Sequence, residues 1–177
     1  NPHSPSRGGR EAAVAIEVAR KQVERAIGLD GGSVAFTGSA TEAINWVLKG
    51  TLEKAPQGRK RIITVATEHA AVLDTCEWLE GTGHDVTRLP VGKDGLLRLD
   101  DVKAALDDTV AIVAAMLVNN EIGVIQPVGE IARHVYETNA HPIEDLTLHR
   151  PQGGLARQDS KTKEVSHLCH RKKWTPK

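Results

Sequence analysis

The segment Val110-Ala111-Ile112-Val113-Ala114-Ala115-Met116-Leu117 is the most apolar run of the chain. The polar string Val118-Asn119-Asn120-Glu121-Ile122-Gly123 follows it directly. An uninterrupted apolar run of this length, bounded by turn residues, predicts a central strand that is buried on both faces. Ligands of open α/β sheets bind at the carboxyl ends of the strands, so the string after this run is expected to form part of a ligand site.

Strand patterns alternate with helix patterns on the amino-terminal side of this run. Strands are expected at 33–36, 61–66, 85–89 and 110–117, and helices at 11–27, 43–49, 71–80, 100–106 and 127–136, the fourth helix capped by Asp100 or Asp101. Residues 1–9 are rich in Pro, Gly and Ser and are expected to form a loop. The alternation predicts an α/β fold, with a mostly parallel sheet and helices on both of its faces.

A second informative string, Thr37-Gly38-Ser39-Ala40-Thr41-Glu42, links an expected strand to an expected helix. The first backbone N–H groups of a helix lack intrahelical acceptors, so Ala40 and Thr41 are candidates for binding a phosphate, with the Thr41 hydroxyl as a further donor. The same letters also fit a plain capping box, Ser39-x-x-Glu42. Together with the Asn119-Asn120 string, the segment suggests a site for a phosphorylated ligand that contains a ring.

Further candidate side chains follow two of the strands. His69 comes after the strand at 61–66; its imidazole is suited to stacking on a heteroaromatic ring or to moving a proton, or else it only caps the next helix. Glu68 is expected to be structural. Asn119, Asn120 and Glu121 offer amide and carboxylate groups to a ligand, although Asn also favours turns.

Composition excludes several classes of function. The chain has 23 Lys+Arg and 23 Asp+Glu, so its net charge gives no reason to expect nucleic acid or a membrane surface as partner. No apolar run is long enough to cross a bilayer, and no signal-peptide pattern is present. The two cysteines, Cys76 and Cys169, form neither a disulfide framework nor a zinc site by spacing, and Cys76 is expected to pack inside a helix. A reducing, cytoplasmic setting is therefore expected, with no bound metal; the string His167-Leu168-Cys169-His170 lacks a second ligand pair.

The chain changes character near Thr138. Residues 138–177 contain eight Lys/Arg, four Asp/Glu and four of the eight His, and they show no convincing strand or amphipathic helix. We expect two parts, a folded region at 1–137 and a divergent basic tail at 138–177 that is disordered or loosely attached.

Taken together and in order, the motifs of residues 1–136 resemble those of the cysteine desulfurases, which are pyridoxal-phosphate enzymes of fold type I in the class V aminotransferase family. The matching strings are Asn1-Pro2-His3-Ser4, Gly9-Arg10-Glu11-Ala12, Thr37 to Glu42, Thr67-Glu68-His69, Asp74-Thr75-Cys76, Asn119 to Gly123 and Gln126-Pro127. The resemblance implies an incomplete large domain of the pyridoxal-phosphate transferase type.

The resemblance also implies roles for particular residues. Ala40 and Thr41 correspond to contacts of the cofactor phosphate, His69 to the residue that stacks on the pyridine ring and helps in proton transfer, and Asn120 to the amide near the ring hydroxyl and the substrate carboxylate. The implied cofactor is pyridoxal 5′-phosphate and the implied substrate is L-cysteine, which becomes L-alanine. The implied partners are a sulfur-acceptor or scaffold protein, for the synthesis of iron–sulfur clusters or other sulfur-containing cofactors, and a second subunit of a homodimer.

The chain departs from the family in several places. The Asp-x-x-Gln and Ser-x-His-Lys elements that follow the helix at 127–136 in the family cannot be read here, and neither Cys76 nor Cys169 matches the persulfide cysteine. The family's opening segment upstream of Asn1 is also absent, and Gly38-Ser39 reverses the usual Ser-Gly order. Without a recognisable Schiff-base lysine, the chain as written is expected to have little or no desulfurase activity.

One explanation of the tail is a shifted reading frame. Cutting the codons one base earlier allows Leu155-Ala156-Arg157 to read Leu-Gly-Lys and Leu168-Cys169-His170 to read Ser-Leu-Ser, strings that the family has in this order. Two other functions stay open: a non-catalytic remnant that binds an intact desulfurase subunit, and another class V enzyme such as a selenocysteine lyase or an aminotransferase.

Overall fold

The computed structural model describes residues 1–29, 33–137 and 146–147 of the chain. These residues form two compact units, one consisting of Asn1–Phe36 and the other beginning at Thr37. The expected boundary near residue 138 lies in a part of the chain that is not described, so it stays a prediction.

The first unit is built on one long helix, α1 (Arg7–Ala26). The helix begins earlier than the apolar periodicity indicated, because the Ser6 hydroxyl accepts a hydrogen bond from the Gly9 N–H and caps it. The strand expected at 33–36 is wrong: these residues have no strand geometry.

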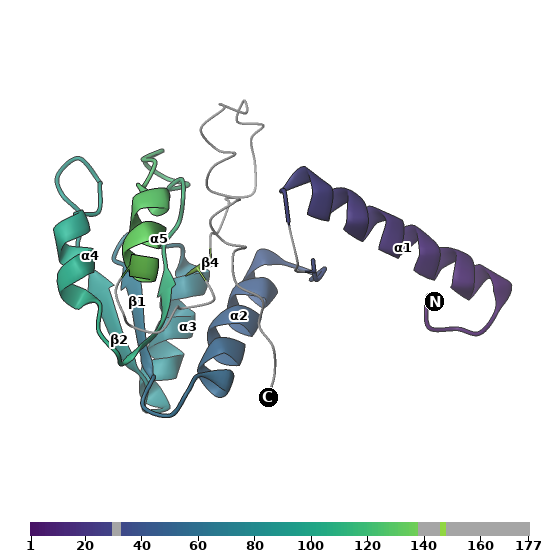
Figure 1. The fold of residues 1–177 in the computed structure, drawn as a ribbon, viewed down its shortest axis with the longest axis horizontal. Coiled ribbons are helices and arrows are strands. Elements are labelled where there is room, and N and C mark those ends of the chain that lie inside the picture. Colours follow the sequence, from purple (N-terminus) through teal and green to yellow (C-terminus); the bar gives the residue numbers. More distant parts are fainter. Residues whose placement is uncertain (30–32, 138–145, 148–177) are drawn as a thin grey trace. The chain divides into compact units, whose positions relative to one another are not determined.

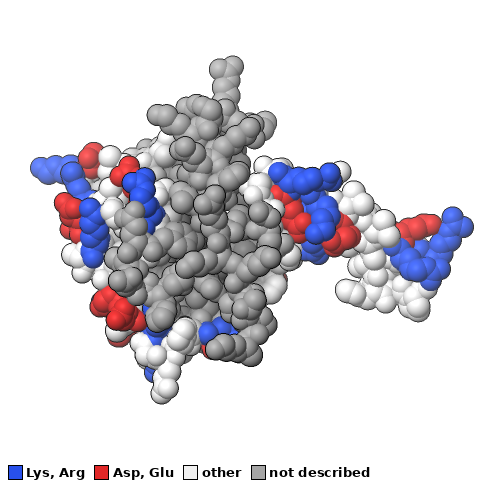
Figure 2. All heavy atoms as spheres, viewed as in Figure 1, with Lys and Arg blue, Asp and Glu red and all other residues white. Residues whose placement is uncertain are grey.

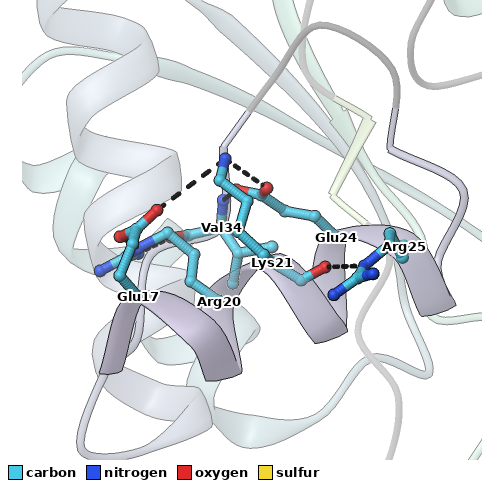
Figure 3. Close-up of polar contacts among 6 residues, drawn as sticks. All are labelled: Glu17, Arg20, Lys21, Glu24, Arg25 and Val34. Carbon is cyan, nitrogen blue, oxygen red and sulfur yellow. Dashed lines mark hydrogen bonds and ion pairs between the residues drawn. The ribbon is translucent and has the colours of Figure 1, made fainter. Parts of the chain in front are cut away.

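Side chains of α1 make the hydrogen bonds to Val34, within the segment 33–36, that a neighbouring strand would otherwise make. The Val34 N–H donates to Glu24 Oε1 at 3.3 Å, and the Arg20 guanidinium donates to the Val34 carbonyl, as Figure 3 shows. Lys21 pairs with Glu24 at 2.8 Å on the same face of the helix. Both backbone groups of Val34 are therefore satisfied without a sheet.

The second unit contains a parallel sheet. Its strands are β1 (Arg61–Val65), β2 (Asp85–Leu89), β3 (Val110–Ala114) and β4 (Leu146–Thr147), in the order β2-β1-β3-β4. All three strand pairings are parallel, and β3 is buried along its whole length. The strand at 110–117 is shorter than expected, and β4 was not expected at all.

Four helices accompany the sheet: α2 (Ala40–Lys54), α3 (Ala70–Gly81), α4 (Leu99–Ala105) and α5 (Val128–Glu137). The connection from β1 to β2 runs in one direction along the sheet, and those from β2 to β3 and from β3 to β4 run in the other. Right-handed crossovers then put α3 on one face and α4 and α5 on the opposite face. Accordingly, α2 packs against α3, and α4 packs against α5 (Figure 1). The expected α/β fold with helices on both faces is confirmed.

Two helices have boundaries or caps that differ from those predicted from the sequence. Helix α2 is longer than the expected 43–49 because Ser39 caps it at Ala40 and because Gly50 lies inside the helix and does not end it. The capping of α4 by Asp100 or Asp101 is wrong: Arg98 is the N-cap residue, without a side-chain cap, and both aspartates lie in the first turn.

The described surface carries charges of both signs. On the face in Figure 2, Lys and Arg side chains lie beside Asp and Glu side chains, and no large area of one sign is visible among the described residues. Arg88, for example, binds both carboxylate oxygens of Glu80, at 2.8 and 2.7 Å. Among the described residues, no helix is both long and apolar enough to cross a membrane.

Candidate ligand site at the carboxyl edge of the sheet

The strand order creates a topological switch point between β1 and β3. The chain leaves β1 towards β2 on one side, while β3 lies on the other side of β1, so the connections diverge at this point of the sheet. In open α/β sheets, ligands bind outside the carboxyl ends of the strands at such a switch point. The loops that border it begin at Ala66 and Ala115, and they carry His69 and Asn120.

The first turn of α2 lies at the same edge. Helix α2 leads to the start of β1 and runs antiparallel to it, so its N-terminus lies near the carboxyl end of β1 (Figure 1). The Ser39 hydroxyl accepts from the Glu42 N–H at 3.1 Å, and Glu42 Oε2 accepts from the Gly38 N–H at 2.7 Å. Ser39 and Glu42 thus cap the helix much as the expected alternative has it, except that Glu42 accepts from the N–H of Gly38 and not from that of the N-cap residue Ser39.

The capping contacts leave two donors of the same turn unused. No described residue accepts a hydrogen bond from the N–H of Ala40 or of Thr41. Both donors lie at the positive end of the helix dipole, and Thr41 is exposed. A cap and a phosphate-binding turn are therefore compatible here, because they use different atoms.

His69 is the N-cap residue of α3. Its Nδ1 accepts from the Ala71 N–H at 3.1 Å, and the residue is exposed. The expected alternative of a helix cap is therefore observed. Because Nδ1 accepts, the proton of a neutral imidazole is assigned to Nε2, which fixes the ring's tautomer.

Glu68 precedes His69 and points the other way, into the protein. Its Oε1 accepts from the N–H of Met116, in the loop after β3, and its Oε2 accepts from the His69 N–H at 3.3 Å. Burial raises the pKa of the Glu68 carboxyl, and the two hydrogen bonds oppose this rise. The structural role expected for Glu68 is confirmed.

Asn119 and Asn120 behave differently although they are neighbours. Asn119 is buried; its Nδ2 donates to the Thr67 carbonyl at 2.8 Å, and its Oδ1 accepts from the N–H groups of Glu121 and Ile122, both at 2.9 Å. Asn120 is exposed at the same edge. Turn chemistry therefore accounts for Asn119, whereas Asn120 remains exposed at the carboxyl edge of the sheet.

Two polar links of this region were not predicted from the sequence. Gln126 is buried and joins the loop after β3 to the loop after β2, through Leu97 N–H at 2.9 Å and the Gly95 carbonyl at 2.8 Å. The link from Asn119 to Thr67 was also missed, because a single sequence carries no mark of a contact between residues 52 positions apart.

The cysteine and metal expectations are tested only in part. Cys76 is fully buried in α3, and burial raises the pKa of its thiol to about 11, as expected for a packing residue. Within the described ranges, no cluster of His, Cys, Asp or Glu is arranged to hold a metal ion. Cys169 and the string 167–170 lie outside the described residues.

These groups fit a phosphorylated aromatic ring. The orphaned N–H groups of Ala40 and Thr41 suit a phosphate, the exposed imidazole of His69 suits a ring face, and the Asn120 amide suits a ring hydroxyl. No described lysine lies in the loops that follow β1 and β3. The arrangement therefore provides for binding and orienting such a ligand, without a covalent anchor among these residues.

Comparison with known proteins agrees with the observed fold. Residues 1–147 match the family Aminotransferase class-V. The chain is 45% identical over 134 residues to the cysteine desulfurase IscS of Rickettsia akari, covering 75% of this chain and 33% of that protein. It is equally similar to the cysteine desulfurase of Homo sapiens, with 29% of that protein covered.

A solved structure, described as a NifS-like protein, superposes with a TM-score of 0.76 at 36% identity, over 84% of this chain and 40% of that one. This confirms the expected fold, part of a large domain of the pyridoxal-phosphate transferase type. The chain spans about a third of the length of the curated relatives that it matches. On the match over residues 1–147, this chain belongs to the class-V aminotransferase family.

Proposed function

We propose that this chain is part of a cysteine desulfurase and that its sheet edge forms half of a pyridoxal 5′-phosphate site. The observation that carries the proposal is the meeting of three elements at one edge: the first turn of α2, the loop after β1 and the loop after β3. The identity of 45% to curated cysteine desulfurases supports the same conclusion.

Each residue has a distinct task in this proposal. The N–H groups of Ala40 and Thr41, with the Thr41 hydroxyl, bind the phosphate. His69 packs its ring on the pyridine and holds or moves a proton at Nε2, while its Nδ1 stays committed to the cap of α3. Asn120 donates its amide to the ring hydroxyl and to the substrate carboxylate. When bound, pyridoxal phosphate supplies the electron sink that amino-acid chemistry needs.

The proposed reaction converts L-cysteine to L-alanine and passes the sulfur to an acceptor or scaffold protein, for iron–sulfur clusters or other sulfur-containing cofactors. The proposed working form is a homodimer in a reducing, cytoplasmic setting. We propose that these 177 residues have little or no such activity, because no Ser-x-His-Lys string can be read in them. Incubation with L-cysteine and pyridoxal phosphate should release no more alanine than a protein-free control; catalytic alanine release would overturn this point.

The ligand assignment has a direct test. Pyridoxine 5′-phosphate carries an alcohol in place of the aldehyde, so it does not react with surface lysines. We expect the chain to bind it at least about tenfold more tightly than pyridoxine, because a phosphate at a helix N-terminus makes charge-assisted hydrogen bonds. Thr41→Ala should weaken binding of the phosphorylated compound and leave pyridoxine binding unchanged. Equal affinity for the two compounds would contradict the proposal.

The tail has its own test. We propose that residues after about 138 are read out of frame. The coding DNA, read one base earlier in this region, should then yield a His-Lys pair near residue 172. If neither alternative frame contains one, this explanation of residues 138–177 is wrong.

A further inference from the structure

The two loops at the switch point share one pattern. In each of them a buried polar residue is followed directly by an exposed one: Glu68 by His69, and Asn119 by Asn120. The exposed members are the residues assigned to the ligand above. The buried members make hydrogen bonds between the two loops, so the pattern separates exposed residues from residues that hold the loops.

The buried members link the two loops reciprocally. Glu68, from the loop after β1, accepts a hydrogen bond from the Met116 N–H beside β3. Asn119, from the loop after β3, donates to the Thr67 carbonyl beside β1 at 2.8 Å. Each loop thus contributes one side chain that hydrogen-bonds to the backbone of the other loop, over sequence separations of 48 and 52 residues.

These contacts also fix the backbone of the exposed neighbours. Glu68 Oε2 accepts the N–H of His69, while Asn119 Oδ1 closes the turn around Asn120 by accepting the N–H groups of Glu121 and Ile122. Burying a carboxylate is costly, and an apolar pair of similar size fills such a space at a lower cost. Stability alone is therefore a weak explanation for a buried glutamate at position 68. A stronger explanation is that Glu68 holds the two loops at a defined distance from each other.

We propose that Glu68 and Asn119 form a reciprocal brace that sets the distance and orientation between His69 and Asn120. They are positioning residues: they act on the ring of the ligand through His69 and Asn120, and they do not contact the phosphate. This inference rests on the proposed function, since it takes the ligand to be a phosphorylated pyridine.

The test uses the full chain and three near-isosteric variants. Glu68→Gln leaves one oxygen for two backbone N–H groups, so its own amide N–H opposes that of Met116 or of His69. Asn119→Asp places a carboxylate oxygen against the Thr67 carbonyl. Gln126→Glu is the matched control. It places a carboxylate oxygen against the Gly95 carbonyl and so disrupts a buried link between two loops of the same kind. No residue assigned to the ligand lies next to Gln126 in the sequence. Thermal unfolding of all three identifies variants that fail to fold, and comparison is made among variants of equal stability.

Two probes separate ring from phosphate. Both brace variants should weaken binding of pyridoxine 5′-phosphate and of pyridoxine by about tenfold, the lower end of the usual effect of removing a partner that orients a ligating group. Binding of inorganic phosphate should stay within about twofold of the wild-type chain, as should all three affinities of the Gln126→Glu control. The circular dichroism of the bound pyridine should also fall in the brace variants, because the ring is held less rigidly.

The outcomes distinguish the two claims. If the wild-type chain binds pyridoxine 5′-phosphate no better than pyridoxine, the proposed function fails and the brace fails with it. If the wild-type chain shows the phosphate preference while brace variants and control bind the ring equally well, the brace alone is overturned. An equal loss in the control also overturns it, because the effect is then one of general destabilisation.

Discussion

The Asn119 carboxamide donates to the carbonyl of Thr67 at 2.8 Å, joining the loop after β3 to the loop after β1. Its Oδ1 accepts two more backbone hydrogen bonds, so Asn119→Ala leaves three backbone groups without their partner. We expect this variant to lower the free energy of unfolding by about 2 kcal/mol. Asn120→Ala, at an exposed position, should change it by less than about 0.5 kcal/mol. Urea denaturation of both variants measures this difference, and equal effects would contradict the turn geometry.

Glu68 predicts a pH dependence of stability. Burial raises its pKa in the folded chain, so the folded state binds a proton that the unfolded state has already lost. The stability from this group is therefore present below the ordinary carboxyl pKa and is lost as pH rises through the raised one. Between about pH 4 and about pH 8, the unfolding free energy of the wild-type chain should fall relative to that of Glu68→Gln. A difference that is constant, or that grows in the opposite direction, would show that Glu68 is not desolvated.

Gly95 predicts a local steric cost. It has φ +75°, and a Cβ atom there would lie 2.9 Å from Val124 Cγ2. Gly58 has φ +94° and nothing within 4 Å of such an atom, so it is a control for the backbone conformation alone. Gly58→Ala should cost about 1 kcal/mol, and Gly95→Ala about 1 kcal/mol more because of overpacking. Chemical denaturation of the two variants gives both values; the packing argument fails if they coincide.

Cys76 should be unreactive in the folded chain. Its thiol is fully buried and its pKa is raised to about 11, so little thiolate exists at neutral pH. In a Cys169→Ser chain, Cys76 should react with a disulfide reagent slowly under native conditions and completely in denaturant. Rapid native reaction would instead make Cys76 a candidate for carrying sulfur.

Local patterns predicted the sheet of the second unit well. Strand β2 matches its expected bounds and β1 differs by one residue, because both follow from short apolar or β-branched runs bounded by turns. The prediction of a strand at 33–36 was wrong for a different reason. A strand needs a neighbouring strand as hydrogen-bond partner, whereas the backbone groups of Val34 bond to the side chains of Arg20 and Glu24.

The residues of the candidate site could be predicted from local sequence, but the contacts between its loops could not. Ala40, Thr41, His69 and Asn120 were indicated by residue type at a strand end or a helix start, which are local properties. The links from Glu68 to Met116 and from Asn119 to Thr67 depend on which strands are neighbours, and a single sequence does not state that order.

In the proposed site, the first turn of α2, His69 and Asn120 bind one phosphorylated pyridine together. The most direct measurement is a titration of the ¹⁵N-labelled chain with pyridoxine 5′-phosphate, following each backbone amide. We expect the amides of Ala40, Thr41, His69 and Asn120 to shift along one saturation curve, while those of Gly58 and Glu80 do not move. Saturable shifts confined to other residues, or different curves for α2 and for the two loops, would contradict it.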